Sequence, residues 1–329
     1  MKQSILETIG ETPLVHLRKL LPAARFDLFG KIEALNPGGS IKDRPAREIL
    51  TEALVSGAVG PQTVIVESSS GNMGIGIAQV CRYLGLKFIC VVDSKTTAQN
   101  IRILRAYGAE VDVVSEPDPE TGELLQARLT RVRELLREHG DSFWPNQYAN
   151  ESNSGAHYRT TMHEITTALQ GKLDYLFVAT STCGTIRGCA EYARDHDLET
   201  KIIAVDSVGS LIFSTEPAPR SIPGLGAGMR PPLCDRSLID EVVHVSDMDC
   251  VNGCRQLMAR EAILAGGSSG GVLSAVSKLQ DRIEAGSTCV AILADRGERY
   301  LDTVYNDEWV RNLVGMTALH SEEAKLVAA

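Results

Sequence analysis

A lysine stands in an unusual place in the first glycine-rich loop of the chain. This loop reads Asn-Pro-Gly-Gly-Ser-Ile-Lys-Asp-Arg over residues 36–44. Ser40 can cap the helix predicted to follow, and Asp43 suits the positive start of that helix. Lys42 does not suit it, because the helix macrodipole disfavours a cation there. From this loop alone, Lys42 is either an exposed lysine paired with a carboxylate or an amine of lowered pKa that acts as a nucleophile or forms a Schiff base.

Two further loops offer hydroxyl and amide groups that suit an anion. Residues 67–76 read Glu-Ser-Ser-Ser-Gly-Asn-Met-Gly-Ile-Gly, and residues 180–185 read Thr-Ser-Thr-Cys-Gly-Thr. Each loop follows a predicted strand and precedes a predicted helix, so N–H donors gather at a helix start. Neither loop contains the Gly-Lys-Ser/Thr of a nucleotide-binding P-loop. A dinucleotide-binding dehydrogenase is a weaker alternative, because no G-x-G-x-x-G opens the first strand–helix unit.

Two more segments are dense in glycine. Residues 266–271 read Gly-Gly-Ser-Ser-Gly-Gly and join two predicted helices, where they could be merely a flexible hinge. Residues 223–230 read Pro-Gly-Leu-Gly-Ala-Gly-Met-Arg and end in a cation.

Strands and helices alternate along the chain in a way that brings these loops together. The predicted strands, which are rich in apolar residues, cover 28–34, 63–67, 87–92, 110–114, 174–179, 201–206, 242–245 and 288–293. The predicted helices cover 72–84, 98–106, 124–139, 156–169, 186–196, 249–264 and 272–285. This alternation is typical of a doubly wound α/β fold with parallel sheets covered on both faces. Since ligands bind at the carboxyl ends of such strands, we expect the loops to meet in one crevice.

Composition limits the classes of partner. The 329 residues suggest about two domains, and 33 Lys+Arg against 42 Asp+Glu leave a net charge of −9. The excess of acidic residues argues against a nucleic-acid partner. The sequence has no apolar stretch near the roughly 18 residues of a membrane span and no signal-peptide pattern, so we expect a cytoplasmic protein. No metal site is predicted, since His157 and His163 lack a third ligand and the eight cysteines are expected to be mostly buried free thiols.

In their order and spacing the motifs resemble the β-replacement branch of fold-type II pyridoxal-phosphate enzymes, the cysteine synthase and cystathionine β-synthase family. The similarity covers about residues 4–312 and begins with Thr-Ile-Gly-Glu-Thr-Pro-Leu-Val at 8–15. It implies pyridoxal 5'-phosphate as cofactor, a homodimer, and two doubly wound α/β domains with mostly parallel sheets. The larger domain is expected over 1–38 and 153–315, the smaller mobile domain over 39–152, and a loose tail over 316–329.

The resemblance also implies roles for individual residues. Lys42 corresponds to the catalytic lysine that binds the cofactor covalently, which decides against the exposed lysine for this position. Asn72 corresponds to the partner of the cofactor's ring oxygen, and Ser268 to that of its ring nitrogen. The cofactor phosphate is assigned to Ser181, Thr182, Cys183, Gly184 and Thr185. The substrate carboxylate is assigned to Ser69, Ser70, Gly71, Asn72, Met73 and Gln147.

Departures from the family pattern point to a subfamily. Ser181 and Cys183 replace glycines of the phosphate loop, and Met73 replaces a threonine. Together with residues 96–100, 145–150 and 295–303, these features resemble the N-(2-amino-2-carboxyethyl)-L-glutamate synthases. The implied reaction joins O-phospho-L-serine to L-glutamate through bound aminoacrylate and releases phosphate, a step towards 2,3-diaminopropionate for siderophores or peptide antibiotics. Substrate binding is then assigned to Arg128, Tyr148 and Ser181, with Arg230 as a further candidate cation.

Two other functions remain open. The nearest is a cysteine synthase that uses O-acetyl- or O-phosphoserine with sulfide. The other is a binding protein without catalytic activity, which the presence of Lys42, Asn72 and Ser268 disfavours.

Overall fold

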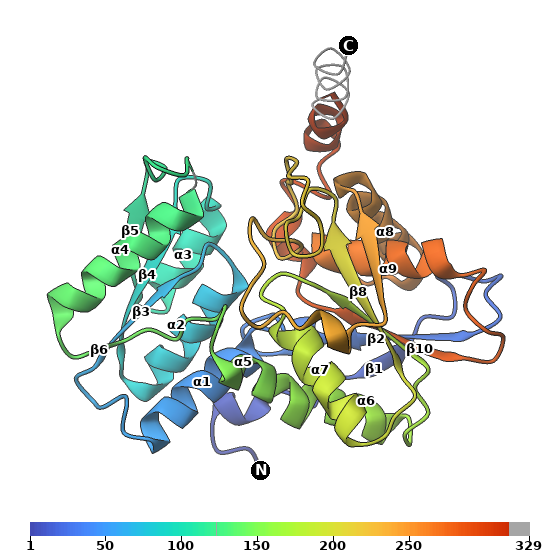
Figure 1. The fold of residues 1–329 in the computed structure, drawn as a ribbon, viewed down its shortest axis with the longest axis horizontal. Helices are drawn as coiled ribbons and strands as arrows, with labels where there is room; N and C mark the ends of the chain where they lie inside the picture. The colour runs from blue at the N-terminus through green and yellow to red at the C-terminus, as the bar shows by residue number, and fades with distance from the viewer. Residues whose placement is uncertain (123, 316–329) are drawn as a thin grey trace.

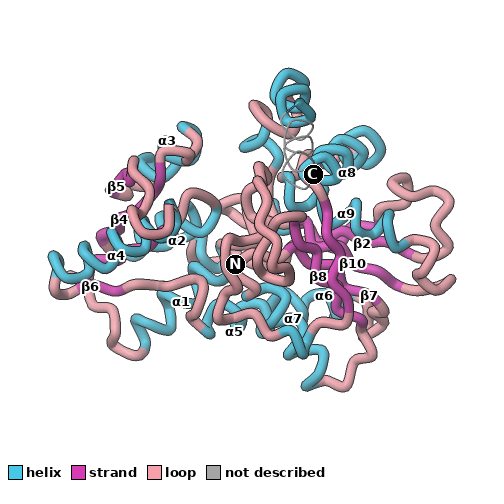
Figure 2. The backbone as a smooth tube through the Cα atoms, turned by 45° about the horizontal axis from the view of Figure 1, so that its top comes forward, coloured by secondary structure: helices cyan, strands magenta, loops and turns pink. Residues whose placement is uncertain are grey.

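The chain forms two separate sheets in this computed structural model, which describes residues 1–122 and 124–315. One sheet has six strands in the order β1-β2-β10-β7-β8-β9, and the other has four in the order β5-β4-β3-β6. Figure 1 shows the two sheets in separate halves of the molecule, and Figure 2 shows loops concentrated between them. The tail predicted over 316–329 lies outside the described residues.

The six-stranded sheet is covered by helices on both faces. Its strands are β1 (Leu14–His16), β2 (Asp27–Ile32), β7 (Tyr175–Ala179), β8 (Lys201–Ser207), β9 (Glu241–Val245) and β10 (Thr288–Leu293). Only β1 pairs antiparallel, with β2. Phe177 packs in a core with α8 (Asp247–Glu261) and α9 (Gly267–Leu279). Its neighbours Leu176 and Val178 pack on the other face with α6 (His163–Ala168) and α7 (Gly184–Asp195). This alternation follows from the strand period of two.

The four-stranded sheet repeats this plan on a smaller scale. Its strands β3 (Val64–Ser68), β4 (Lys87–Asp93), β5 (Glu110–Val114) and β6 (Ser142–Phe143) are all parallel. One face packs against α1 (Asp43–Val55), α2 (Asn72–Leu84) and α3 (Ala98–Ala106). The other face packs against α4 (Leu124–His139). The predicted doubly wound α/β fold with mostly parallel sheets is therefore confirmed.

One predicted helix has a different form. Instead of a single helix over 156–169, the chain forms α5 (Glu151–Ala156), a π-helical turn η3 (His157–Met162) and then α6. A π-turn widens the helix and re-aims its side chains, and such turns occur often at functional sites. Short 3-10 turns complete the structure: η1 (Ile5–Thr8), η2 (Glu33–Leu35), η4 (Arg236–Leu238) and η5 (Gly297–Tyr300).

The hinge considered for residues 266–271 is wrong, because α9 begins at Gly267 and contains most of that segment. The glycines are needed for close packing of α8 against α9. A Cβ on Gly270 would lie 2.0 Å from the carbonyl oxygen of Cys250, and one on Gly253 would lie 2.1 Å from that of Gly270. Contact between the two helix backbones therefore outweighs the low helix propensity of glycine.

The cysteines and the apolar segments are the remaining features that the sequence analysis considered. All eight cysteines lie among the described residues as free thiols, and all but Cys234 are buried, which confirms the predicted buried thiols. No helix in the described part of the chain is long and apolar enough to cross a membrane.

Candidate active site

The loops singled out in the sequence meet at two adjoining cavities. The first cavity is lined by Lys42, Asn72, Ser268 and residues of the 181–185 loop. The second, of about 480 Å³, shares Lys42 and Asn72 with the first and extends over residues 68–73 and 95–97. The cavities lie where strands of the two sheets end, as expected for parallel α/β sheets.

Nearly all of the predicted site residues line these cavities. The first cavity is lined by Lys42, Asn72, Ser181, Thr182, Cys183, Thr185 and Ser268. The second is lined by Ser69, Ser70, Gly71, Met73, Arg128, Gln147, Tyr148 and Ser181. Gly184 lies behind the first cavity, where a Cβ would lie 2.2 Å from Oδ1 of Asn153. Arg230 lines neither cavity.

Lys42 lies directly before α1 and contributes its side chain to both cavities. Its backbone N–H donates to Oγ of Ser40 at 3.2 Å. Among the described residues, no hydrogen-bond partner faces its amine. Burial lowers the pKa of Lys42 to about 8, although the acidic groups of Cys183 and Asp295 nearby oppose that shift. A partly neutral amine near neutral pH is what a nucleophile or proton acceptor requires.

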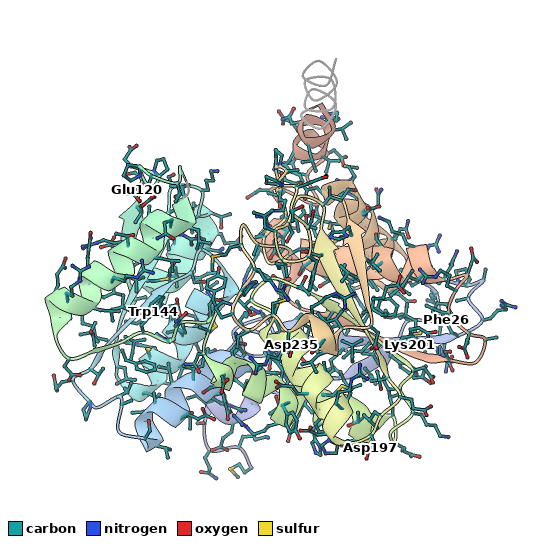
Figure 3. The ribbon with its side chains drawn as sticks, viewed as in Figure 1. Phe26, Glu120, Trp144, Asp197, Lys201 and Asp235 are labelled. Atoms are coloured by element: carbon teal, nitrogen blue, oxygen red, sulfur yellow. The ribbon has the colours of Figure 1, made fainter. Side chains whose placement is uncertain are left out.

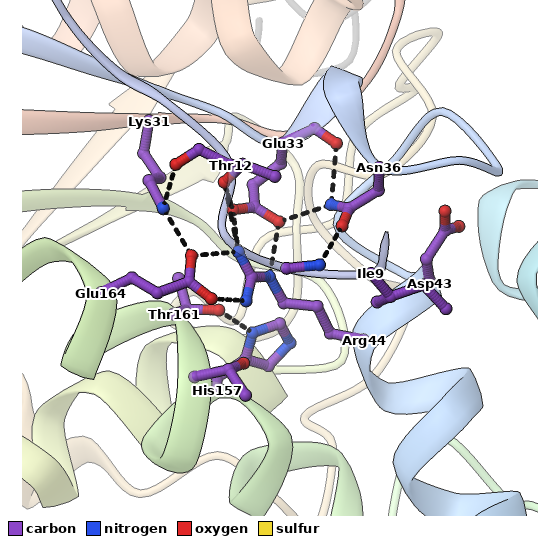
Figure 4. Close-up of polar contacts among 12 residues, drawn as sticks. Ile9, Thr12, Lys31, Glu33, Asn36, Asp43, Arg44, His157, Thr161 and Glu164 are labelled. Atoms are coloured by element: carbon purple, nitrogen blue, oxygen red, sulfur yellow. Dashed lines mark hydrogen bonds and ion pairs between the residues drawn. The ribbon is translucent and has the colours of Figure 1, made fainter. Parts of the chain in front are cut away.

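A buried ionic cluster, formed by Lys31, Glu33, Arg44 and Glu164, anchors the start of α1 (Figure 4). Arg44 and Glu33 are both 0% exposed, and Nε of Arg44 lies 2.7 Å from Oε2 of Glu33. Nη1 of Arg44 also lies 2.6 Å from Oε1 of Glu164, whose other oxygen lies 2.6 Å from Nζ of Lys31. Because Arg44 follows Lys42 by two residues, the cluster holds Lys42 in place against the larger sheet.

The 181–185 loop presents the start of α7 to the first cavity. Cys183 adopts a left-handed backbone with φ of +65°, a conformation that favours glycine. The hydroxyl of Thr185 lies 3.2 Å from Nε2 of His157, while Nδ1 of His157 lies 2.9 Å from the Thr161 hydroxyl. Burial lowers the pKa of His157 well below its ordinary value, so the ring is neutral. No motif in the sequence revealed this contact of His157, which lies at the start of the π-helical turn η3.

Gln147 is held at the second cavity by the end of β3. Its side-chain Nε2 donates to the carbonyl of Ser68 at 3.2 Å, and its backbone N–H donates to Oε2 of Glu67 at 3.2 Å. Trp144, labelled in Figure 3, donates its indole N–H to Oε1 of Glu67 at 3.2 Å. Burial raises the pKa of Glu67 to about 7. Glu67 thus positions Gln147. Glu67 opens the quoted segment 67–76, but no motif in the sequence assigned it this role.

Arg128 reaches the second cavity from α4 and is held there by one hydrogen bond and one ion pair. Its Nη1 donates to Oγ of Ser70 at 2.6 Å, and its Nε lies 3.2 Å from Oδ2 of Asp93. Lys95 lines the same cavity and was not predicted, although it directly precedes the quoted residues 96–100. Lys95, Arg128 and Arg299 therefore line the same cavity as Lys42, in a chain of net charge −9.

The donor set of the first cavity fits pyridoxal 5'-phosphate. Lys42 supplies an amine for the cofactor's aldehyde, and the start of a 12-residue helix supplies N–H groups for its phosphate. Ser268, which is 4% exposed, supplies a neutral hydroxyl for the ring nitrogen, and Asn72 supplies an amide for the ring oxygen.

Comparison with known proteins agrees with this donor set. The family model of pyridoxal-phosphate dependent enzymes matches residues 5–295. An N-(2-amino-2-carboxyethyl)-L-glutamate synthase of Ralstonia nicotianae is 45% identical over 316 residues, which are 96% of this chain and 93% of that protein.

Solved structures are similar over nearly their full length. A hydrogen sulfide-producing enzyme from Fusobacterium nucleatum is 32% identical with a TM-score of 0.86, over 92% of this chain and 98% of that one. An O-acetylserine dependent cystathionine β-synthase from Helicobacter pylori is 31% identical with a TM-score of 0.85, over 92% and 98% of the two chains.

Proposed function

The chain belongs to the family of pyridoxal-phosphate dependent enzymes, and on that basis we propose that it joins the amino group of L-glutamate to the β-carbon of O-phospho-L-serine. The products are N-(2-amino-2-carboxyethyl)-L-glutamate and phosphate. The observation that carries the proposal is the second cavity, in whose lining Arg128 and Lys95 stand together with Lys42. Likeness to the Ralstonia synthase supports the same reaction.

When bound, pyridoxal phosphate withdraws electrons from the substrate's α-carbon, which allows the α-proton and the β-substituent to leave. Lys42 is the base in this proposal, with Nζ accepting the α-proton, because it is the buried amine shared by both cavities. Ser268 donates or accepts a hydrogen bond without forcing a charge on the cofactor's ring nitrogen. Thr182, Thr185 and the first N–H groups of α7 would hold the phosphate of the cofactor, and Ser69, Ser70 and Gln147 would receive the carboxylate of the substrate.

Both substrates are anions, and the second cavity offers the matching charge. O-phosphoserine carries a phosphate and glutamate carries two carboxylates. Arg128 is 12% exposed and held by Asp93 and Ser70, so its guanidinium is already oriented before a substrate arrives. An oriented cation inside a cleft attracts anions more strongly than the same charge in bulk water.

Three further features complete the proposal. Residues 39–152 form a smaller mobile domain, which the grouping of β3–β6 with α1–α4 supports. The chain pairs with a second copy, and its product supplies 2,3-diaminopropionate for a siderophore or peptide antibiotic. These last two features rest on resemblance.

The reaction is tested by supplying both candidate pairs of substrates to the purified, cofactor-loaded protein. We expect phosphate release from O-phosphoserine and formation of the glutamate adduct, detected by mass spectrometry. O-acetylserine and sulfide serve as the competing pair. If cysteine forms from sulfide while no glutamate adduct appears, the chain is a cysteine synthase instead.

Replacement of Arg128 tests the anion-binding role of the second cavity. Arg128→Met is expected to raise the KM of at least one of the two substrates about tenfold or more, because a charge-assisted hydrogen bond to an anion is lost. Steady-state kinetics with each substrate varied in turn measure the effect. Arg131→Met is the matched control, since Arg131 lies on the same helix but pairs with Asp112, Glu134 and Glu138. Unchanged KM values for both substrates in Arg128→Met would contradict the role.

A further inference from the structure

The amide of Asn72 is held from two sides by residues near the end of β10. A guanidinium nitrogen of Arg299 donates to Oδ1 of Asn72. Nδ2 of Asn72 donates to Oδ2 of Asp295 at 2.8 Å. Because arginine has only donors, the Asn72 atom that faces it must be the oxygen. Together, this donor and the acceptor Asp295 on the other side determine which way round the amide lies.

The carboxyl group of Asp295 is buried and closely packed. The residue is 1% exposed, and its Oδ2 also accepts the hydroxyl proton of Tyr300 at 2.5 Å. Its Oδ1 has no hydrogen-bond partner among the described residues. A Cβ on Gly266 would lie 2.0 Å from that oxygen, so the glycine before α9 leaves the space that the carboxyl group occupies. A buried carboxylate with so little room has one orientation.

Arg299 connects Asn72 and Asp295 to the glycine-rich loop of residues 36–44, called the lysine loop below. Besides Asn72, its guanidinium donates to the carbonyl oxygen of Gly38. The lysine loop, the start of α2 and the segment after β10 therefore meet at Asn72. In the sequence, residues 295–303 indicated a subfamily but had no role.

We infer that Asp295 is a positioning residue that, together with Tyr300, orients the Asn72 amide toward the cofactor. The amide nitrogen has two hydrogens, and Asp295 accepts one of them. The other remains for the ring oxygen of pyridoxal phosphate. An amide that is oriented beforehand loses less side-chain entropy when the cofactor binds, which favours binding. The inference rests on cofactor binding and does not depend on the choice of second substrate.

The test is a double-mutant cycle on cofactor affinity. Apoprotein is titrated with pyridoxal phosphate, and Kd is read from the absorbance of the bound cofactor. Asn72→Ala is expected to raise Kd about tenfold, as the loss of one hydrogen bond does, and Asp295→Ala about fivefold. The double variant is expected to match Asn72→Ala alone, because Asp295 acts through Asn72.

Other variants separate positioning from folding. Tyr300→Phe removes only the hydroxyl that steadies Asp295 and is expected to raise Kd about two- to fivefold. Tyr305→Phe is the matched control, because the Tyr305 hydroxyl bonds the backbone of Ala265 at 2.7 Å and does not contact Asn72. Circular dichroism and thermal melts of each apoprotein identify variants that fail to fold, and Tyr300→Phe replaces Asp295→Ala in the cycle if needed.

Two results would overturn the inference. One is an effect of Asp295→Ala or Tyr300→Phe that persists in full in the Asn72→Ala background. The other is a Kd unchanged by both variants while Asn72→Ala weakens binding. Since no assay contains glutamate, an error in the proposed reaction leaves these outcomes unaffected.

Discussion

Lys42→Ala is expected to lower turnover by about a thousandfold or more and to abolish covalent attachment of the cofactor. The variant removes the only lysine that lines both cavities, as far as the described residues go. Borohydride treatment followed by peptide mass spectrometry measures the attachment, and a phosphate-release assay measures turnover. Lys95→Ala is the control, since Lys95 lines only the second cavity and should leave attachment intact. Cofactor still fixed to the Lys42→Ala protein would contradict the assignment.

The pH dependence of attachment gives the same assignment an independent check. With a pKa of about 8 instead of 10.5, roughly a tenth of Lys42 is neutral at pH 7, against about one part in three thousand at the ordinary value. Attachment requires the neutral amine. We therefore expect its rate in the apoprotein to rise with pH through about 8 and then level off. A rate that keeps rising to about pH 10 would mean an ordinary lysine.

Arg44→Met is expected to lower the free energy of unfolding by about 3–5 kcal/mol. The variant leaves Glu33 buried without its cation and removes one of the two cations that face Glu164. Urea or thermal unfolding of the apoprotein measures the loss. Arg159→Met is the control, because the 49% exposed Arg159 pairs with Glu48 and Glu52 at the surface. Such pairs contribute about 1 kcal/mol or less. Equal losses in the two variants would contradict the anchoring role of the cluster.

The cluster also sets a direction for acid sensitivity. Arg44 and Lys31 outweigh the effect of burial and lower the pKa of Glu164 from 4.5 to about 2. A carboxyl group whose pKa is lower in the folded than in the unfolded protein stabilises the fold at pH values above the unfolded-state pKa. That stabilisation is lost as the pH falls through the folded-state pKa. Stability supplied by Glu164 is therefore complete above pH 4.5 and lost toward about 2.

Much of this protein was predictable from local sequence. The apolar strands and their alternation with helices predicted the doubly wound α/β fold, because a parallel sheet covered by helices buries both of its faces. The Asn-Pro-Gly-Gly-Ser-x-Lys, Ser-Gly-Asn and Ser-Thr-Cys-Gly-Thr loops predicted much of the cavity lining, since a tight turn and a helix start are short-range features. The roles expected for Lys42, Asn72 and Ser268 came from the resemblance to a known family, and Ser268 lies outside these three loops.

Contacts between distant segments depended on the tertiary structure. Asn72 donates a hydrogen bond to Asp295, which lies 223 residues further along the chain. His157 contacts the hydroxyl of Thr185 from a π-helical turn, which the periodicity of apolar residues does not predict. Residues 266–271 look like a flexible turn in sequence, yet 267–271 are helical, and α8 packs against this stretch at a distance that only glycine allows. Local sequence determined the elements and the loops. Which side chains orient one another was decided by the order of strands and the closeness of packing, which are properties of the whole chain.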